Sequence, residues 1–157
     1  MRFPDPPKGL KAIPWRIPIL FYKIGLGWLF GNRALMLSVK GRKSGKIRQT
    51  VLEIILHLPE DHSYYVASGF GTRSQWFQNL QNDPRVIIQV GSKRLNATGH
   101  RLNPEEAGTV FVAYAQKYPR AIRWLAKKLD YQMTHTLEGY RDFAKELPII
   151  KFTIRED

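Results

Sequence analysis

A short basic turn is the segment of this sequence best suited to chemistry. The chain reads Gly-Arg-Lys-Ser-Gly-Lys-Ile-Arg from Gly41 to Arg48, so Arg42, Lys43 and Lys46 join Arg48 in one turn. Glycines let backbone amides turn toward a ligand, and charge-assisted donors hold phosphate oxygens strongly. The spacing differs from a Walker loop, in which Ser or Thr directly follows Gly-Lys. The turn predicts a phosphate site, with a charged hairpin tip as the alternative.

A second glycine-containing loop, Ser68-Gly69-Phe70-Gly71, lies between an expected strand and an expected helix. Loop amides just before a helix can bind an anion or the edge of a flat ring. The alternative is an ordinary loop whose glycines adopt left-handed backbone angles. By itself this loop supports a cofactor site without establishing one.

Most other kinds of catalytic site find little support. The chain has no cysteine, which excludes disulfides, thiolate catalysis and cysteine-ligated metals. The four histidines are scattered and lack carboxylate partners at a metal-ligand spacing, so we expect no metal site. There is no Gly-x-Ser-x-Gly nucleophile elbow and no complete dinucleotide fingerprint. A cofactor that carries hydride asks the protein mainly for binding, orientation and electrostatics, and this sequence can supply those.

Positive charge is concentrated at the start of the chain. The 157 residues carry a formal net charge of +12, and residues 1–50 hold eleven Lys and Arg against the single acid Asp5. This asymmetry favours an anionic partner, such as a phosphate-bearing ligand, nucleic acid or acidic lipid. A nucleic-acid-binding module is the less favoured of these, because the aromatic residues are not interleaved with the basic run as base stacking requires.

The start of the chain also predicts an apolar helix over residues 18–30, with Pro18 in its first turn and Gly31-Asn32 at its end. Residues 1–31 are thus expected to form a basic and apolar helical extension. The segment is shorter than the ~20 apolar residues that span a bilayer, but it suits packing over a core or peripheral contact with a membrane. No secretory signal is evident, so we expect a cytoplasmic protein, with peripheral contact at the inner membrane surface left open.

The remaining sequence predicts a small sheet with helices around it. Strand patterns are joined by short turns, and parallel neighbours would need crossovers of a dozen residues or more, so the sheet should be mainly antiparallel. The expected strands cover 34–39, 49–58, 63–67, 86–90, 94–102 and 148–154, and the expected helices cover 74–82, 103–117, 119–129 and 137–146. Six such strands predict a barrel over 34–155 within one α+β domain of residues 1–157.

Three stretches of the chain resemble the deazaflavin-dependent nitroreductase family. They are LMLSVKGRKSGKIRQT, YYVASGFGTRSQWFQNLQNDPRVIIQV and LPIIKFTI. The strongest markers are the GRKSGxxR turn and an A-S-x-x-G loop that precedes W-[YF]-x-N-L and a D/N-P-x-V strand. The resemblance covers about residues 34–154 and implies a split β-barrel, related to flavin mononucleotide-binding barrels and often dimeric.

The resemblance also implies a set of cofactor-binding residues. The family's basic turn grips the cofactor's phosphate, which implies this role for Arg42, Lys43 and Arg48, with Ser44 and Gly45 shaping the loop. The family's A-S-x-x-G loop borders the ring system, and the helix after it supports the site. The corresponding residues here are Ala67, Ser68, Gly69, Gly71, Trp76 and Asn79.

The implied activity is that of an oxidoreductase that uses the deazaflavin coenzyme F-420 and delivers hydride to a quinone, nitroaromatic or activated alkene. A flavin mononucleotide-dependent (FMN-dependent) enzyme of the same fold is the alternative from this class. Solvent or a tyrosine would supply the proton, and no catalytic residue is assigned. Five aromatic residues of the second half are candidates for an apolar pocket beside the cofactor, although core or surface packing is the more ordinary role: Tyr114, Tyr118, Trp124, Tyr131 and Tyr140.

Overall fold

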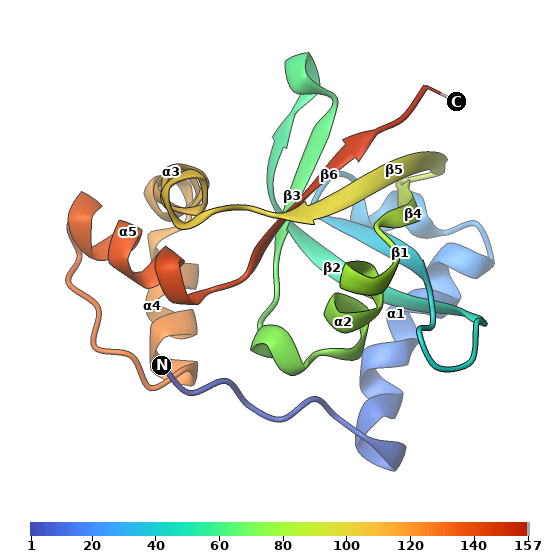
Figure 1. The fold of residues 1–157 in the computed structure, drawn as a ribbon, viewed down its shortest axis with the longest axis horizontal. Coiled ribbons are helices and arrows are strands. Elements are labelled where there is room, and N and C mark those ends of the chain that lie inside the picture. The colour runs from blue at the N-terminus through green and yellow to red at the C-terminus, as the bar shows by residue number, and fades with distance from the viewer. Residues whose placement is uncertain (157) are drawn as a thin grey trace.

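The computed structural model describes residues 1–156 and contains a closed barrel of six strands (Figure 1). Around the barrel the order is β1-β2-β3-β6-β5-β4, and β1 pairs with β4 to close it. Every neighbouring pair is antiparallel, which confirms the α+β barrel expected from the short connections. The strands are β1 (Ala34–Lys40), β2 (Ile47–Leu58), β3 (Ser63–Ala67), β4 (Arg85–Val90), β5 (Lys93–Arg101) and β6 (Ile149–Ile154).

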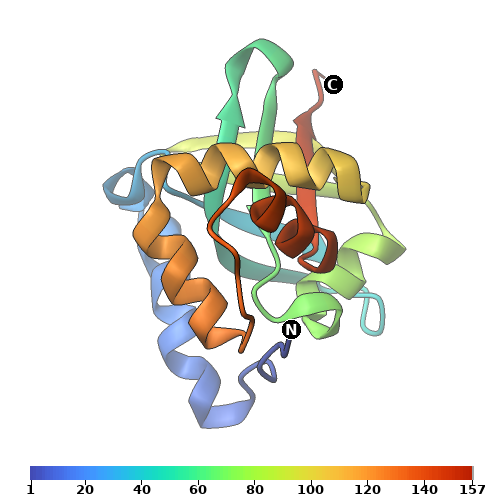
Figure 2. The same cartoon turned by 90° about the vertical axis from the view of Figure 1, so that its left-hand side faces the viewer.

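Helices lie outside the barrel in three places. In Figure 2, α3, α4 and α5 cover one side of the barrel, and Figure 1 shows α1 on the other side of the molecule from α4. The short helix α2 lies across one end of the barrel, after the connection from β3 (Figure 1). The helices are α1 (Ile13–Lys23), α2 (Gln75–Asn82), α3 (Pro104–Lys117), α4 (Pro119–Lys128) and α5 (Leu137–Glu146).

The hydrophobic core has two parts. One fills the barrel, where Leu35 and Leu37 on β1 point inward at the two-residue period of a strand. A Cβ on Gly99 would lie 2.7 Å from the Phe152 ring and 2.8 Å from Leu80 of α2, so only glycine fits where α2 closes the barrel. The second part lies between the barrel and α3, α4 and α5, and its fully buried members include Phe111, Ile122, Leu129, Phe143 and Ile149.

The N-terminal helix departs from its prediction. It spans Ile13–Lys23, and a separate 3-10 turn covers Gly27–Phe30, where the sequence predicted one helix over 18–30. Pro14 lies in the first turn, where its missing N–H leaves no hydrogen bond unmade, so the helix begins earlier than expected. Gly25, at φ +82°, adopts the left-handed backbone that favours glycine and separates the helix from the turn.

Tyr22 anchors α1 to the barrel through its hydroxyl and its ring. The Tyr22 hydroxyl donates a hydrogen bond to the carbonyl oxygen of Ala34 at 3.1 Å, and its ring stacks on Phe30 with centroids 5.4 Å apart. Burial raises the pKa of Tyr22 to about 12, so the hydroxyl keeps the proton that it donates. Tyr22 is the only buried residue of α1, and most other side chains of the helix remain exposed.

Candidate functional site

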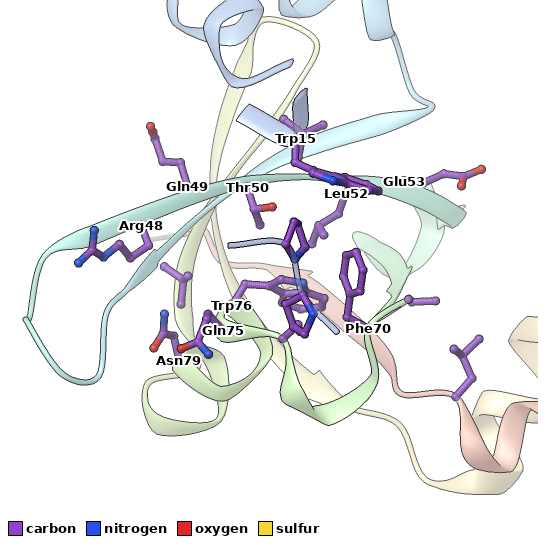
Figure 3. A pocket seen from close by; sticks show the side chains of 18 of the residues that line it. Trp15, Arg48, Gln49, Thr50, Leu52, Glu53, Phe70, Gln75, Trp76 and Asn79 are labelled. Carbon is purple, nitrogen blue, oxygen red and sulfur yellow. The ribbon is translucent and has the colours of Figure 1, made fainter. Parts of the chain in front are cut away.

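A cavity of about 650 Å³ lies between β2, α2, α4 and the N-terminal segment. This volume is within the range of small-molecule and cofactor sites. Figure 3 shows Trp15, Leu52, Phe70 and Trp76 around its centre, with Arg48 toward one end. The basic turn between β1 and β2 contributes Arg42, Lys43, Ser44 and Arg48 at one end, whereas the walls elsewhere are mainly apolar.

The basic turn is fixed in place by α2. The Arg42 guanidinium donates to the side-chain oxygens of Gln75, Gln78 and Asn79, with distances of 2.6 to 3.1 Å. The Arg42 backbone N–H also donates to the Asn79 oxygen, at 3.1 Å. All three partners are neutral amides, so they orient the guanidinium without cancelling its charge. The result is a positive charge held rigidly at one end of the cavity.

The other donors of the turn are more exposed. Lys43, Ser44 and Arg48 line the same end of the cavity, and the Ser44 hydroxyl accepts from the Arg48 guanidinium at 3.4 Å. Gly45 makes the turn possible with φ +71°, and its N–H donates to the Gly41 carbonyl at 2.8 Å. This end of the cavity therefore offers three cationic side chains and a hydroxyl, a donor set that suits a phosphate.

The Ser68–Gly71 loop divides into lining and supporting residues. Gly69 lines the cavity, as do Ala67 before the loop and Phe70 within it. The Ser68 hydroxyl is buried and donates to the Gly71 carbonyl at 2.6 Å, with the Ser74 hydroxyl 3.0 Å away. Ser68 therefore shapes the loop from within.

Of the eleven cofactor-binding residues predicted from the sequence, the structure brings eight to this one cavity. They are Arg42, Lys43, Ser44, Arg48, Ala67, Gly69, Trp76 and Asn79. The other three, Gly45, Ser68 and Gly71, are not among the lining residues and occupy the supporting positions in the turn and the loop. Residues from two distant segments of the chain thus line one cavity.

The opposite part of the cavity is mainly apolar, and residues from the second half of the chain form its walls. α3 contributes Phe111 and Tyr114, α4 contributes Trp124 and Leu125, and Leu147 follows α5. Of the five candidate aromatic residues, Tyr114 and Trp124 line the cavity, whereas Tyr118, Tyr131 and Tyr140 are not among its lining residues. A flat, largely apolar ring is the kind of ligand that such walls accommodate.

Tyr114 and Glu53 form a hydrogen-bonded pair at this apolar part. The Tyr114 hydroxyl donates to the Glu53 carboxylate at 3.1 Å. Burial, followed by the charge of Glu53, raises the pKa of Tyr114 well above its ordinary value. Glu53 is the only acidic residue among the described residues that line the cavity. The pair connects α3 to β2 and keeps the tyrosine protonated.

The first seven residues form an N-terminal strap that runs along the cavity. Pro6 and Pro7 are among the lining residues. Arg73 holds the strap twice, by donating to the Asp5 carboxylate at 2.6 Å and to the Phe3 carbonyl at 2.7 Å. The Phe3 ring lies against Gly71, where a Cβ would approach the ring to 2.7 Å.

Sequence reasoning named Trp124 of α4 but missed the strap, Trp15 and Lys128, because these residues come from distant parts of the chain and no local pattern joins them. It also missed Gln75 and Gln78, for which a signal existed. Gln75 and Asn79 are four residues apart on α2, so two amide side chains share one helical face beside the basic turn.

The residues of the cavity fit a phosphate-bearing flavin-type cofactor. The fixed Arg42 and the exposed Lys43 and Arg48 match a phosphate, and the apolar walls match a planar ring system. Among residues 1–156 there is no group of three or more His, Asp or Glu side chains placed to hold a metal ion. Fold and cavity together define a split-barrel protein of the flavin-binding kind.

Comparison with known families specifies this class. Residues 23–135 match the F420H(2)-dependent quinone reductase family, and the chain belongs to this family. It is therefore a deazaflavin-dependent reductase whose cofactor is the deazaflavin coenzyme, which decides between the deazaflavin and the FMN that the residues alone left open. Among curated proteins, none matches the chain.

Solved structures agree in fold. A structure described as an F420-H2 dependent reductase (FDR-A) is 21% identical, with a TM-score of 0.55, and the match covers 78% of this chain and 95% of that one. A structure described as a domain-swapped dimer has the same identity and TM-score and covers 78% and 81%. A conserved hypothetical protein from Mycobacterium tuberculosis is 15% identical, with a TM-score of 0.55 and coverage of 85% and 79%.

Proposed function

We propose that the Gly41–Arg48 turn holds the phosphate of the deazaflavin coenzyme, and that hydride passes to an acceptor in the apolar part of the cavity. One observation carries this assignment: a single continuous cavity joins the cationic turn to the apolar walls of α3 and α4. The bound, reduced coenzyme supplies the hydride. The family's description names quinones, so a quinone is the first acceptor to test, ahead of nitroaromatics and activated alkenes.

In this proposal each part of the site has a distinct task. Lys43 and Arg48 bind the phosphate directly, while Arg42, already bonded to α2, contributes a fixed positive charge. Ala67 and Gly69 border the ring because their small size leaves room for it, and Trp76 lines the same cavity. The apolar walls exclude water from the hydride path.

A side-by-side titration tests the site. The coenzyme and FMN are added to the purified protein, and binding is followed by fluorescence. We expect saturable binding of the deazaflavin coenzyme. The Kd should be about tenfold higher for Arg48→Gln, because this variant loses one charged contact with the phosphate. Arg85→Gln is the matched control, because Arg85 is an exposed arginine on β4 that does not line the cavity. Equal affinity of both variants would refute the phosphate assignment.

A peripheral membrane contact is the second part of the proposal. The segment from the strap to β1 exposes a series of large apolar side chains beside Lys8, Lys11, Arg16 and Lys23: Leu10, Ile13, Ile17, Leu20, Ile24, Trp28 and Leu29. Ile24 is 69% exposed and Trp28 60% exposed. Apolar and aromatic side chains flanked by lysine and arginine suit the surface of an anionic bilayer. No helix formed by the described residues has the length and apolar character that crossing a bilayer requires.

Vesicle co-sedimentation tests this contact. Binding to vesicles that contain phosphatidylglycerol should fall strongly in Leu20→Glu/Ile24→Glu, while coenzyme affinity should be retained. Leu137→Glu is the control, since Leu137 is a similarly exposed leucine on α5. Undiminished vesicle binding by the double variant would count against the contact.

The oligomeric state also belongs to the proposal. One similar structure is described as a domain-swapped dimer, and split barrels of this kind are often dimeric. We propose a homodimer for this chain as well. Light scattering coupled to size-exclusion chromatography should give twice the mass of the 18.2 kDa chain, and a mass of one chain would refute the dimer.

A further inference from the structure

The charged side chains of the cavity are unevenly distributed. Arg42, Lys43 and Arg48 belong to the turn, whereas Lys128 belongs to α4. Figures 1 and 2 both show this turn and α4 on opposite sides of the molecule. Lys128 is therefore the one cation among the described lining residues that lies away from the basic turn.

Two indole rings hold the ammonium of Lys128. Its Nζ lies 4.8 Å from the centre of the Trp124 ring and 5.8 Å from the centre of the Trp15 ring, over both rings. Such cation–π contacts orient the ammonium without neutralising it. No acidic side chain among residues 1–156 forms a salt bridge with Lys128. The charge therefore remains available to a ligand in the cavity.

The same two rings suit a planar acceptor. Trp15 lies beside Leu52 in the cavity, with its ring edge-to-face against Phe70 at 5.5 Å between centroids (Figure 3). Trp15 and Trp124 are more than half exposed, so neither ring is committed to the core. Electron-rich indoles stack well on an electron-poor ring such as a quinone. An acceptor between or beside these rings would bring its oxygen close to the Lys128 ammonium.

Hydride transfer to a quinone produces a negative charge that the Lys128 ammonium could stabilise. When hydride adds to a neutral quinone, the electron pair moves onto oxygen, and the product is a hydroquinone anion. That oxygen then takes a proton to give the hydroquinone. A nearby ammonium stabilises the developing anion and can deliver the proton, after which water restores the ammonium.

The other titratable lining residues are less suited to this task. Arginine does not give up its proton in proteins, which removes Arg42 and Arg48 as proton donors. The Tyr114 hydroxyl is directed to Glu53, and its raised pKa makes it a poor acid. Lys43 lies with the basic turn, where the proposed function places the phosphate.

We propose that Lys128, held by Trp15 and Trp124, is a catalytic residue that contacts the acceptor oxygen, stabilises the anion formed by hydride transfer and supplies its proton. Two of the three residues lie inside the segment that matches the family, whereas Trp15 lies before it. The inference rests on the proposed function, because it requires the coenzyme phosphate at the basic turn and the acceptor near α4.

Steady-state kinetics with 1,4-naphthoquinone, combined with coenzyme titration, test the proposal on the full chain. We expect Lys128→Met to lower kcat about 100-fold, which is the usual loss when one stabilising or proton-transferring group is removed. The Kd of the coenzyme should be unchanged. Lys128→Arg should recover part of the loss, because it restores the charge but not a proton that can be transferred. Lys127→Met is the matched control on the same helix, since Lys127 does not line the cavity, and it should leave kcat unchanged.

A binding measurement separates the acceptor from the coenzyme. In the coenzyme-free protein, 1,4-naphthoquinone should quench tryptophan fluorescence saturably, and Trp15→Phe/Trp124→Phe should lose most of this signal. The proposal is overturned if Lys128→Met retains the wild-type kcat. It is also overturned if Lys127→Met lowers kcat as much as Lys128→Met does. A Lys128→Met variant that loses coenzyme affinity would also overturn it, by placing Lys128 at the coenzyme. Failure of the wild-type protein to bind coenzyme would instead refute the proposed function.

Discussion

Arg42 and Asn79 are joined by two hydrogen bonds to one oxygen. The side-chain oxygen of Asn79 accepts from the Arg42 guanidinium at 2.8 Å and from the Arg42 backbone N–H at 3.1 Å. Asn79 is 4% exposed, so this oxygen has little access to water. Through this pair, α2 determines where the basic turn places its charge.

Because Asn79 fixes the position of Arg42, replacing Asn79 should weaken cofactor binding. We expect Asn79→Ala to raise the Kd of the deazaflavin coenzyme about tenfold, because Arg42 loses its fixed position. Asn79→Asp should weaken binding at least as much, since the carboxylate keeps the hydrogen bonds but opposes the charge. Isothermal titration calorimetry measures both, with exposed Asn82→Ala on the same helix as the control. Unchanged affinity of Asn79→Asp would show that the charge of Arg42 is not used.

The strap should control access to the cavity. Arg73→Ala removes the bonds to Asp5 and to the Phe3 carbonyl, and we expect the coenzyme to dissociate several-fold faster, because the strap is then held less firmly next to Pro6 and Pro7. Stopped-flow displacement measures this rate. Arg123→Ala, which removes an exposed arginine of α4 that does not line the cavity, is the control. A rate equal to that of the wild type would mean that the strap is a passive wall.

Two tryptophans should separate acceptor binding from membrane binding. Trp15 lines the cavity, whereas Trp28 is exposed in the 3-10 turn after α1 and does not line it. We expect Trp15→Ala to raise the KM for a quinone about tenfold, the effect of losing one stacking contact, with KM unchanged in Trp28→Ala. Trp28→Ala should instead lower vesicle binding more than Trp15→Ala does. The reverse pattern would contradict both assignments.

The ion pair between Asp61 and Lys151 predicts a pH dependence of stability. Lys151 donates to the Asp61 carboxylate at 2.5 Å, and this hydrogen bond is the main cause that lowers the pKa of Asp61 from 3.8 and raises that of Lys151 from 10.5. The contribution of Asp61 is present above its ordinary pKa and is lost as pH falls through the lowered value. That of Lys151 is present below its ordinary pKa and is lost as pH rises through the raised value.

Asp61→Asn should accordingly have a slightly lower Tm than the wild type at neutral pH, because the pair is exposed. The difference should close at acid pH, once Asp61 is protonated in the wild type. Thermal melts from neutral to acid pH measure it, and a difference that stays constant over this range would contradict the ion-pair explanation.

Local patterns accounted for most of the fold. Strand β3 and helix α5 have the bounds predicted from the sequence, since apolar alternation and caps are properties of neighbouring residues. α3 begins as expected, because the Asn103 side chain accepts from the N–H of Glu106 and Pro104 follows it. The helix over 18–30 was predicted wrongly, because proline at two positions left its start undetermined.

By itself, the sequence determined the barrel's strands, the basic turn and the glycine-containing loop after β3, because each depends on residues close together in the chain. Tertiary structure alone decided that Arg42 is held by Asn79, that the strap lies along the cavity, and that Trp15 and Trp124 meet at Lys128. Trp124 and Lys128 are four positions apart on α4, but the other contacts join residues that are 37 to 113 positions apart. A local sequence pattern cannot predict such long-range contacts, because they follow from how the barrel closes and how the helices pack around it.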